Sequence, residues 1–447
     1  MKTWFLILCL FFINAIPVYS FQIVYPKSKN VTIDSNCTFF IGNETGQKQL
    51  KINGENVKLY KTGAFKYPVD LKPGENIFTI DNGIEKQTYK IIKPVKKTEA
   101  PDKSIAKYYN SSKYIELAQD NVPLRSTPID GGLNRLQHLQ KGIVFEAIGE
   151  QNGFYKVKLA RDDFAWIPKD SANMTSQTNN SQAKLISHFS YETLQEHIYI
   201  YKFDKKVPYI LYECNGLDLT IYNISGYDFG KVEAHISNAK LFGYNSSFNE
   251  NNELIIKINK PITNFKDLKI TIDPGHGGNE YGAIGCLGEK EKDINLKIAL
   301  LLRERLLQSG AKVFMTREDD SYVSLSDRVK FANEHNSQIF ISIHANALPD
   351  SLAKNDIRGV EVYYFYPQAK PLASKILNAI SLETKLDKNR IIPQSFAVIR
   401  NTQNVSILIE TGYIIDPQDE EKLIDENIQK EIVNGIIRGL ENYLNDI

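Results

Sequence analysis

The stretch KITIDPGHGGNEYGAIG, residues 269–285, decides the fold of the C-terminal part of the chain. In it, the end of an apolar run (residues 268–272) is followed by a single histidine, His276, and five glycines. An apolar run of this length predicts a buried β-strand, and the glycines allow the backbone to turn tightly beyond its end. An imidazole at such a place indicates a chemical role whose partners come from elsewhere in the chain.

Around this stretch, the sequence alternates between strand and helix patterns. A helix is expected from Asp293, with apolar residues on one face and an end at Gly310. Further strands are expected at residues 312–315, 339–343, 360–365 and 406–409, and further helices at residues 325–334, 369–386 and, in two segments, from about residue 417 to the C-terminus. We therefore expect residues 268–447 to form an α/β domain with a mainly parallel sheet and helices on both faces.

Three polar residues occupy the same position relative to the expected strands. His276, His344 and Glu410 each lie at or just past the C-terminal end of an apolar strand. In an open α/β sheet the ligand crevice lies outside these strand ends. Each residue alone has an ordinary explanation as a turn, a cap or a solvated edge, but their shared position favours a common site.

The residue types in this candidate site indicate metal chemistry. Two imidazoles and one carboxylate are the three-ligand set of catalytic zinc, which leaves a fourth position for water. The carboxylate ligand needs a loop that reaches the first histidine, and the segment GCLGEKEKDINL offers Glu289, Glu291 and Asp293 as alternatives. Zinc lowers the pKa of bound water to about 7, and a second carboxylate, Glu410, would move protons.

The motifs of residues 269–444 closely resemble those of the zinc-dependent N-acetylmuramoyl-L-alanine amidases. The matching strings, in order, are IDPGHGG (272–278), GAIG (282–285) with EKDINL (291–296), MTREDD (315–320), LSDRVKFAN (325–333), ISIHAN (341–346), RGVEVYY (358–364) and ILIETGY (407–413). The resemblance implies that His276, Glu291 and His344 hold one Zn²⁺ and that Glu410 is the catalytic carboxylate. It selects Glu291 because the ligand of the family directly precedes a Lys-Asp pair, here residues 292–293.

The resemblance also implies the reaction. The chain is expected to be a secreted peptidoglycan hydrolase that cleaves the amide bond between N-acetylmuramic acid and the L-alanine of the stem peptide. Glu410 would help to deprotonate the attacking water and return the proton to the alanine amine. The alternatives are another zinc-dependent cell-wall peptidase and a non-catalytic wall-binding protein, and the intact set of four residues opposes the second.

Three further positions accompany these motifs. Arg328 could support the site, but we expect it instead to form a salt bridge that stabilises its own helix. Residues 390–392 read Arg-Ile-Ile where many members of the family read Arg-Gly-Val, which departs from the family pattern. Residues 345–357 are too few for the autoinhibitory helix of some periplasmic relatives, so we expect an open site controlled by the upstream domains or by expression.

The upstream regions have the short alternating runs and turn residues of antiparallel β-structure. Residues 21–93 predict a β-sandwich and resemble bacterial immunoglobulin-like modules, and residues 113–169 resemble a bacterial Src-homology-3 barrel through LRSTP (124–128) and AWI (165–167). That barrel would either bind cell-wall peptides or act as a spacer. Residues 183–267 form a β-rich module similar to amidase-N-terminal modules, and the polar residues 94–112 and 170–182 are expected to be linkers. His138 is predicted to lie on the surface, and His188, His197 and His235 to be structural or surface residues.

The first twenty residues have the pattern of a secretory signal, with Lys2, an apolar stretch and small residues before Phe21. The apolar stretch is shorter than the ~20 residues that span a bilayer, so we expect cleavage and no stable membrane anchor. The protein would then act in the periplasm, the cell wall or the medium. Three cysteines remain after residue 20, and their odd number and wide spacing indicate neither a disulfide framework nor a cysteine zinc site.

Length and composition limit the remaining classes. The chain has 447 residues, 42% of them hydrophobic and 24% charged, which is typical of globular domains and too long for one core. Its formal net charge is +1. A surface that binds nucleic acid needs an excess of positive charge, so no nucleic-acid partner is expected.

Overall fold

The computed structural model describes residues 21–95, 105–176, 182–237, 240–384 and 386–446. The expected signal at residues 1–20 lies outside the described residues. The chain divides into two compact units. The first is Met1–Val95 with the segments Gly285–Gly288 and Leu348–Asn355, and the second contains the rest of the chain.

The first unit contains two β-sheets around one core. One sheet has the order β1-β3-β6 and the other the order β2-β8-β7-β4-β5. The strands are β1 (Gln22–Tyr25), β2 (Asn30–Thr32), β3 (Cys37–Asn43), β4 (Lys51–Ile52), β5 (Glu55–Asn56), β6 (Ala64–Asp70), β7 (Gly74–Asp81) and β8 (Lys86–Lys93). Phe40 and Phe65 from the first sheet meet Ile80 and Ile91 from the second, and all four are fully buried. The apolar residues of each alternating strand thus face the other sheet.

The second unit begins with three antiparallel sheets that share one hydrophobic core. The strands of the first are β9 (Lys107–Leu117), β10 (Val122–Arg125), β11 (Arg135–Leu139), β12 (Val144–Gln151), β13 (Phe154–Lys158), β14 (Phe164–Pro168) and β15 (Ala172–Thr175). The second contains β16 (Leu185–Glu192), β17 (Glu196–Phe203), β21 (Tyr244–Phe248) and β22 (Glu253–Asn259), and the third β18 (Tyr209–Glu213), β19 (Leu217–Tyr222) and β20 (Lys231–Ser237). Because their apolar residues form one cluster, these sheets support one another.

One strand begins in a stretch that was expected to be a linker, and a second lies inside another such stretch. β9 begins at Lys107, within residues 94–112, and β15 lies within residues 170–182. The two strands pair with each other over Ala172–Thr175. Ile115, Leu117 and Ala172 of this pair are buried in the shared core. The ends of both expected linkers thus contain strand structure.

The C-terminal part of the second unit is built on a six-stranded sheet of order β24-β23-β25-β28-β26-β27. Its strands are β23 (Lys269–Pro274), β24 (Lys312–Met315), β25 (Ile339–Asn346), β26 (Val360–Tyr364), β27 (Lys388–Pro393) and β28 (Val405–Tyr413). All neighbouring pairs are parallel except β26 with β28. The unusual residues 390–392 lie in β27, which was not expected as a strand.

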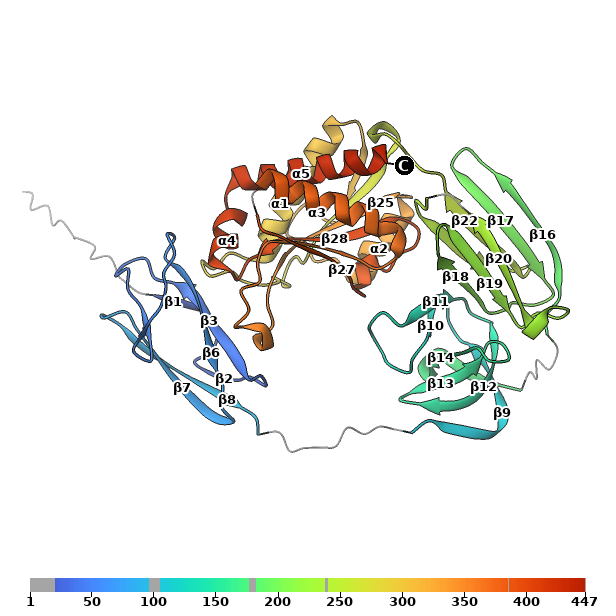
Figure 1. Cartoon of the computed structure of the whole chain (residues 1–447), viewed down its shortest axis with the longest axis horizontal. Helices are drawn as coiled ribbons and strands as arrows, with labels where there is room; N and C mark the ends of the chain where they lie inside the picture. The colour runs from blue at the N-terminus through green and yellow to red at the C-terminus, as the bar shows by residue number, and fades with distance from the viewer. Residues whose placement is uncertain (1–20, 96–104, 177–181, 238–239, 385, 447) are drawn as a thin grey trace, which may run out of the picture. The chain divides into compact units, whose positions relative to one another are not determined.

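Helices cover both faces of this sheet. They are α1 (Glu291–Gln308), α2 (Leu325–Glu334), α3 (Lys370–Thr384), α4 (Pro417–Leu423) and α5 (Glu426–Asn445), with short 3-10 turns η1 (Lys169–Ser171), η2 (Asp228–Gly230), η3 (Phe265–Asp267), η4 (Asp350–Leu352), η5 (Pro367–Ala369) and η6 (Ala397–Ile399). Figure 1 shows α1, α3 and α5 together on one side of the sheet. On the other face, Ala332 of α2 packs with Phe340 and Leu408 of the sheet. The predicted fold class, an α/β domain preceded by all-β regions, is confirmed.

None of the described helices combines the length and the apolar character needed to span a membrane.

Candidate metal centre

His276 comes directly after β23, in a loop whose backbone is unusual. Its φ angle is 63°, in the left-handed region that most side chains avoid. Before it, Gly275 lies against the other histidine of the site, because a Cβ atom on Gly275 would come 2.2 Å from Cε1 of His344. A Cβ atom on Gly282 would likewise come 2.3 Å from Oε2 of Glu291. These glycines are required because the site leaves no room for a side chain, a reason beyond the tight turn that the sequence indicated.

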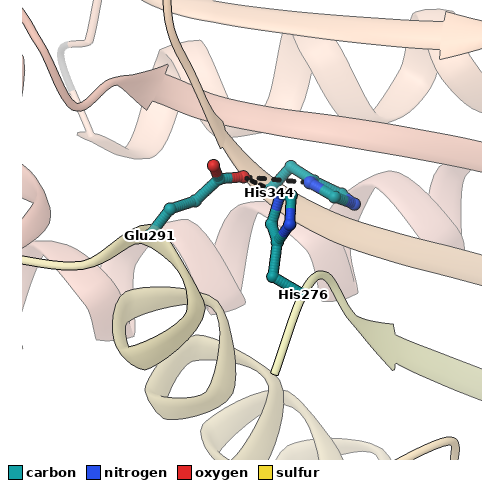
Figure 2. Close-up of side chains that lie close together, drawn as sticks. All are labelled: His276, Glu291 and His344. Carbon is teal, nitrogen blue, oxygen red and sulfur yellow. Dashed lines mark hydrogen bonds and ion pairs between the residues drawn. The ribbon is translucent and has the colours of Figure 1, made fainter. Parts of the chain in front are cut away.

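The structure brings His276, Glu291 and His344 together, as Figure 2 shows. Oε1 of Glu291 lies 3.1 Å from Nε2 of His276 and 2.9 Å from Nδ1 of His344. The two imidazole rings are 5.0 Å apart between centroids and nearly perpendicular, at 78°. One potential ligand atom from each residue lies within 4.8 Å of the others. We call these three residues the metal centre.

Glu291 reaches the histidines because it is the first residue of α1. The helix was expected from Asp293, and it begins two residues earlier. A carboxylate at this end of a helix is favoured by the helix dipole. Oε2 of Glu291 accepts a hydrogen bond from the Ala283 backbone N–H at 2.8 Å, so one oxygen is held by the loop and the other faces the histidines. The alternatives Glu289 and Asp293 are not part of the histidine cluster found among the described residues.

The charge state of Glu291 follows from its partners. Burial by itself would raise the pKa of this carboxyl group, but the hydrogen bonds with His276 and His344 outweigh burial and hold the pKa well below its usual range. Its side chain is 7% exposed, against 29% for His276 and 18% for His344. Glu291 is therefore an anion in a protected position, whereas the histidines remain accessible to solvent.

Glu410 lies on β28, opposite His344 of β25 in the parallel register. Residues paired in this way project from the same face of a sheet. Its Oε2 atom is buried and has no hydrogen-bond partner among the described residues. Burial raises the pKa of Glu410 well above its usual value, and the charges of Glu291 and Glu361 raise it further. Glu361 faces Glu410 across the antiparallel pair β26–β28.

Two buried arginines hold the loop that carries His276. Arg317 donates to the carbonyl oxygens of Pro274 at 3.0 Å and Gly275 at 2.9 Å. Arg328 donates to the carbonyl oxygen of His276 at 2.8 Å. Such contacts fix the backbone from which the imidazole projects.

The interpretation of Arg328 as a residue that stabilises its own helix was wrong. Its ion-pair partner is Asp273 at the end of β23, at 2.7 Å, and both side chains are almost completely buried. The second arginine, Arg317, was missed. The only signal for it was a charged residue directly after an expected strand, within the motif MTREDD.

The other histidines considered from the sequence lie outside the metal centre. His188 stacks on Tyr201, and His197 and His235 lie beside Glu192 and Asp218. His138 was expected on the surface but is half-buried, with Nε2 3.3 Å from an Arg135 nitrogen.

The three residues of the metal centre fit a zinc ion by their chemistry. Two imidazole nitrogens and one carboxylate oxygen are the donor set of catalytic zinc sites, and tetrahedral zinc then keeps one open position. The carboxylate is ionised, as a ligand has to be. The arrangement therefore supports a metal-dependent hydrolase.

The sequence of the chain is similar to those of known amidases. A family model described as N-acetylmuramoyl-L-alanine amidase matches residues 270–442. The chain is 32% identical over 246 residues to the probable cell wall amidase LytH of Staphylococcus epidermidis, covering 55% of this chain and 77% of that protein. It is 34% identical over 218 residues to the protein of the same name in Staphylococcus saprophyticus, covering 48% and 72%. The solved structure of the N-acetylmuramoyl-L-alanine amidase AmiC2 of Nostoc punctiforme shares 35% identity over 40% of this chain and 97% of that one, with a TM-score of 0.38.

A donor set of two histidines and one glutamate, on an α/β sheet whose sequence matches these relatives over most of their length, leads to one conclusion: the chain belongs to the N-acetylmuramoyl-L-alanine amidase family.

Proposed function

We propose that the protein is exported and hydrolyses the amide bond between N-acetylmuramic acid and L-alanine in peptidoglycan, with one Zn²⁺ held by His276, Glu291 and His344. The observation that carries this proposal is the metal centre itself, in which three segments far apart in the sequence bring their ligand atoms within 4.8 Å. Beside it, Glu410 offers a buried carboxylate oxygen without a hydrogen-bond partner among the described residues.

Glu410 is the proton carrier of this reaction. When bound, zinc supplies Lewis acidity, which lowers the pKa of a coordinated water to about 7 and stabilises charge on a carbonyl oxygen. A carboxyl group with a raised pKa both accepts and returns a proton near neutral pH, as a general base and acid must. Glu410 takes a proton from the attacking water and gives it to the alanine nitrogen as the C–N bond breaks. The products are the free lactyl carboxylate and a peptide with an L-alanine amino terminus.

Arg317 and Arg328 act as positioning residues. They bind three consecutive carbonyl oxygens of the β23 end and its loop, at Pro274, Gly275 and His276. His276 has a backbone conformation that few residues adopt unaided, so these hydrogen bonds keep its imidazole directed at Glu291.

The upstream regions would direct the enzyme to its substrate. We assign residues 1–20 to a signal that is removed on export, residues 21–93 to an immunoglobulin-like module, residues 113–169 to an SH3-like barrel and residues 183–267 to a third β-rich module. The two matched cell wall amidases of Staphylococcus support a place of action at the wall.

Digestion of purified peptidoglycan by the zinc-loaded chain tests the proposal. Mass spectrometry should find glycan strands with free lactyl carboxylates and peptides that begin with L-alanine. Glu410→Gln, which keeps the shape of the side chain, should retain zinc and release such peptides far more slowly than the unmodified chain. Release of free carboxy-terminal amino acids instead would show a wall carboxypeptidase, and binding without any release would show a wall-binding protein.

A further inference from the structure

A cleft outside the metal centre lies within the same unit. Its volume is about 920 Å³. One wall is formed by residues of β11 and the turn after it, another by Tyr244, Asn245 and Ser246 of β21, and a third by α2 and the segment that follows η6. The cleft is therefore bounded by all-β elements on one side and by the α/β domain on the other. We call it the arginine cleft, after Arg135 and Arg400, which both line it.

The arginine cleft concentrates positive charge without matching negative charge. Among the residues that the structure describes, Arg135 and Arg400 have no carboxylate ion partner, and Nε of Arg135 is buried without a hydrogen-bond partner. Arg125, which lies near these two arginines, forms an ion pair with Asp130. Asp120, the one acidic residue of the cleft lining, accepts a backbone N–H from Lys141 at 2.9 Å.

The neighbouring groups respond to this charge. Burial lowers the pKa of Arg400, and the charges of Arg135 and Arg125 lower it further. Burial also lowers the pKa of His138 to about 4, with added contributions from Arg135 and Arg400. His138 is therefore neutral at physiological pH. A cleft lined by two positive charges without a matching negative charge attracts an anion.

The walls of the arginine cleft are held in place by hydrogen bonds. Gln137 and Gln140 of the β11 segment donate to Ser246 of β21, at 3.4 Å and 3.3 Å. On the opposite side, Asn401 donates to Asn333 of α2 at 2.6 Å. The cleft thus carries side-chain amides and hydroxyls that suit the backbone of a peptide, around two cations that suit a carboxylate.

The arginine cleft is connected to the metal centre through one loop. Tyr322 lines the cleft, and a Cβ atom on Gly278 would come 3.2 Å from the Cβ atom of Tyr322. Gly278 also donates its N–H to the Asp320 carbonyl oxygen at 2.9 Å. Gly278 is two residues from His276, so a single loop contact separates the lining of the cleft from the loop that carries a ligand of the metal centre.

We propose that the arginine cleft is a second substrate subsite that binds the carboxylate of a further stem peptide on the peptidoglycan strand being cut. The inference rests on the proposed function, because peptidoglycan carries peptides with free carboxylates at regular intervals along its glycan. Arg135 and Arg400 bind the carboxylate, each with the paired N–H groups that make guanidinium–carboxylate bonds strong. The enzyme therefore prefers strands with several stem peptides to a single muramyl peptide.

The double variant Arg135→Gln/Arg400→Gln tests the subsite. We expect kcat/KM on strands with several stem peptides to fall by more than about tenfold, because two charge-assisted contacts are lost, and kcat/KM on a single muramyl peptide to change less than about twofold. Arg305→Gln, at an exposed position of α1, is the matched control and should leave both values unchanged. Equal loss on both substrates, or no loss on either, would overturn the subsite.

A binding measurement separates this proposal from the proposed function. Calorimetry with the zinc-loaded full chain should detect a soluble stem peptide with free carboxylates, and the signal should weaken when the carboxylates are amidated or in the double variant. Binding of a phosphodiester wall polymer in place of the peptide, through the same arginines, would reassign the cleft. If the wild-type chain releases no L-alanine amino termini yet binds the peptide through Arg135 and Arg400, the proposed reaction fails while the peptide site stands.

Discussion

The metal centre and the arginine cleft are two polar regions of one unit, and they differ in how their charges are balanced. At the metal centre, the carboxylate of Glu291 lies within 3.1 Å of both imidazoles, so each group has a partner. In the arginine cleft, two arginines without a carboxylate ion partner among the described residues line one space, and burial together with their charges lowers the pKa of the neighbouring His138. Paired charges let the metal centre keep its shape around a metal, whereas the unpaired positive charges of the arginine cleft attract an anionic ligand.

The same contrast exists inside the active site between two buried glutamates. Glu291 has two imidazoles and a backbone N–H as partners, and its pKa is lowered. Glu410 has a buried oxygen without a partner among the described residues, lies near two other carboxylates, and has a raised pKa. Two carboxyl groups whose surroundings shift their pKa values in opposite directions suit different roles, one as a metal ligand and the other as a proton carrier.

Loss of a ligand at the metal centre has the largest expected effect. His344→Ala removes one of three donors, so the zinc content should fall to background and kcat/KM by at least about 10⁴-fold, as when one member of a catalytic unit is removed. Elemental analysis and peptidoglycan digestion measure both quantities. His197→Ala, outside the cluster, is the control. Stoichiometric zinc in the His344 variant would refute the ligand assignment.

Glu410→Gln tests the contrast between the two glutamates. The amide cannot accept a proton, so we expect a loss of about 10²- to 10⁴-fold in kcat with zinc retained. Glu291→Gln should lose zinc as well as activity, because an amide is a weaker ligand than a carboxylate. If both variants lost zinc to the same degree, the division of roles between them would be wrong.

Arg328→Gln tests how far zinc binding at the metal centre depends on the arginine that holds the His276 loop. The change leaves Asp273 buried without its cation, which typically costs about 3–5 kcal/mol of unfolding free energy, and it frees the His276 carbonyl oxygen. Zinc affinity should fall about 10- to 100-fold, as expected for a residue that orients a ligand. Urea unfolding and zinc titration provide the two readouts. A loss of stability with unchanged zinc affinity would restrict Arg328 to a structural role.

The smallest expected effect is a change in the pKa of His138 in the arginine cleft. Arg135→Gln removes one positive charge 3.3 Å from Nε2 of His138, so the pKa of His138 should rise from about 4 towards its ordinary value, by about one unit. NMR titration of the imidazole measures this shift. A carboxylate ligand should raise the same pKa in the unmodified protein. An unchanged pKa of His138 in the variant would mean that burial alone lowers it and that the cleft has no excess of positive charge at this position.

Local sequence was sufficient for most strands of the α/β sheet and for the two histidines of the metal centre, whereas the choice of Glu291 among three carboxylates needed the resemblance to the family. Apolar runs such as residues 268–272 carry strand information in a few consecutive residues, and α2 has the predicted bounds, Leu325–Glu334. The ligands were accessible because each lies in a short motif whose residue types are rare together. The sequence did not predict strand β27 or the full lengths of β25 and β28. Backbone pairing with a neighbouring strand lengthens a strand beyond its apolar core.

By itself, then, the sequence indicated the two histidines of the metal centre and three candidate carboxylates, because these residues stand in motifs that can be read along the chain, and the family resemblance selected Glu291 among the three. Tertiary structure alone decided what Arg328 holds and that Gly275 makes room for His344. It also decided that Arg135 and Arg400, 265 residues apart in the numbering, line one cleft. The physical reason is that charge and space act through distance in the folded chain, and no local pattern of residues records the distance between remote segments.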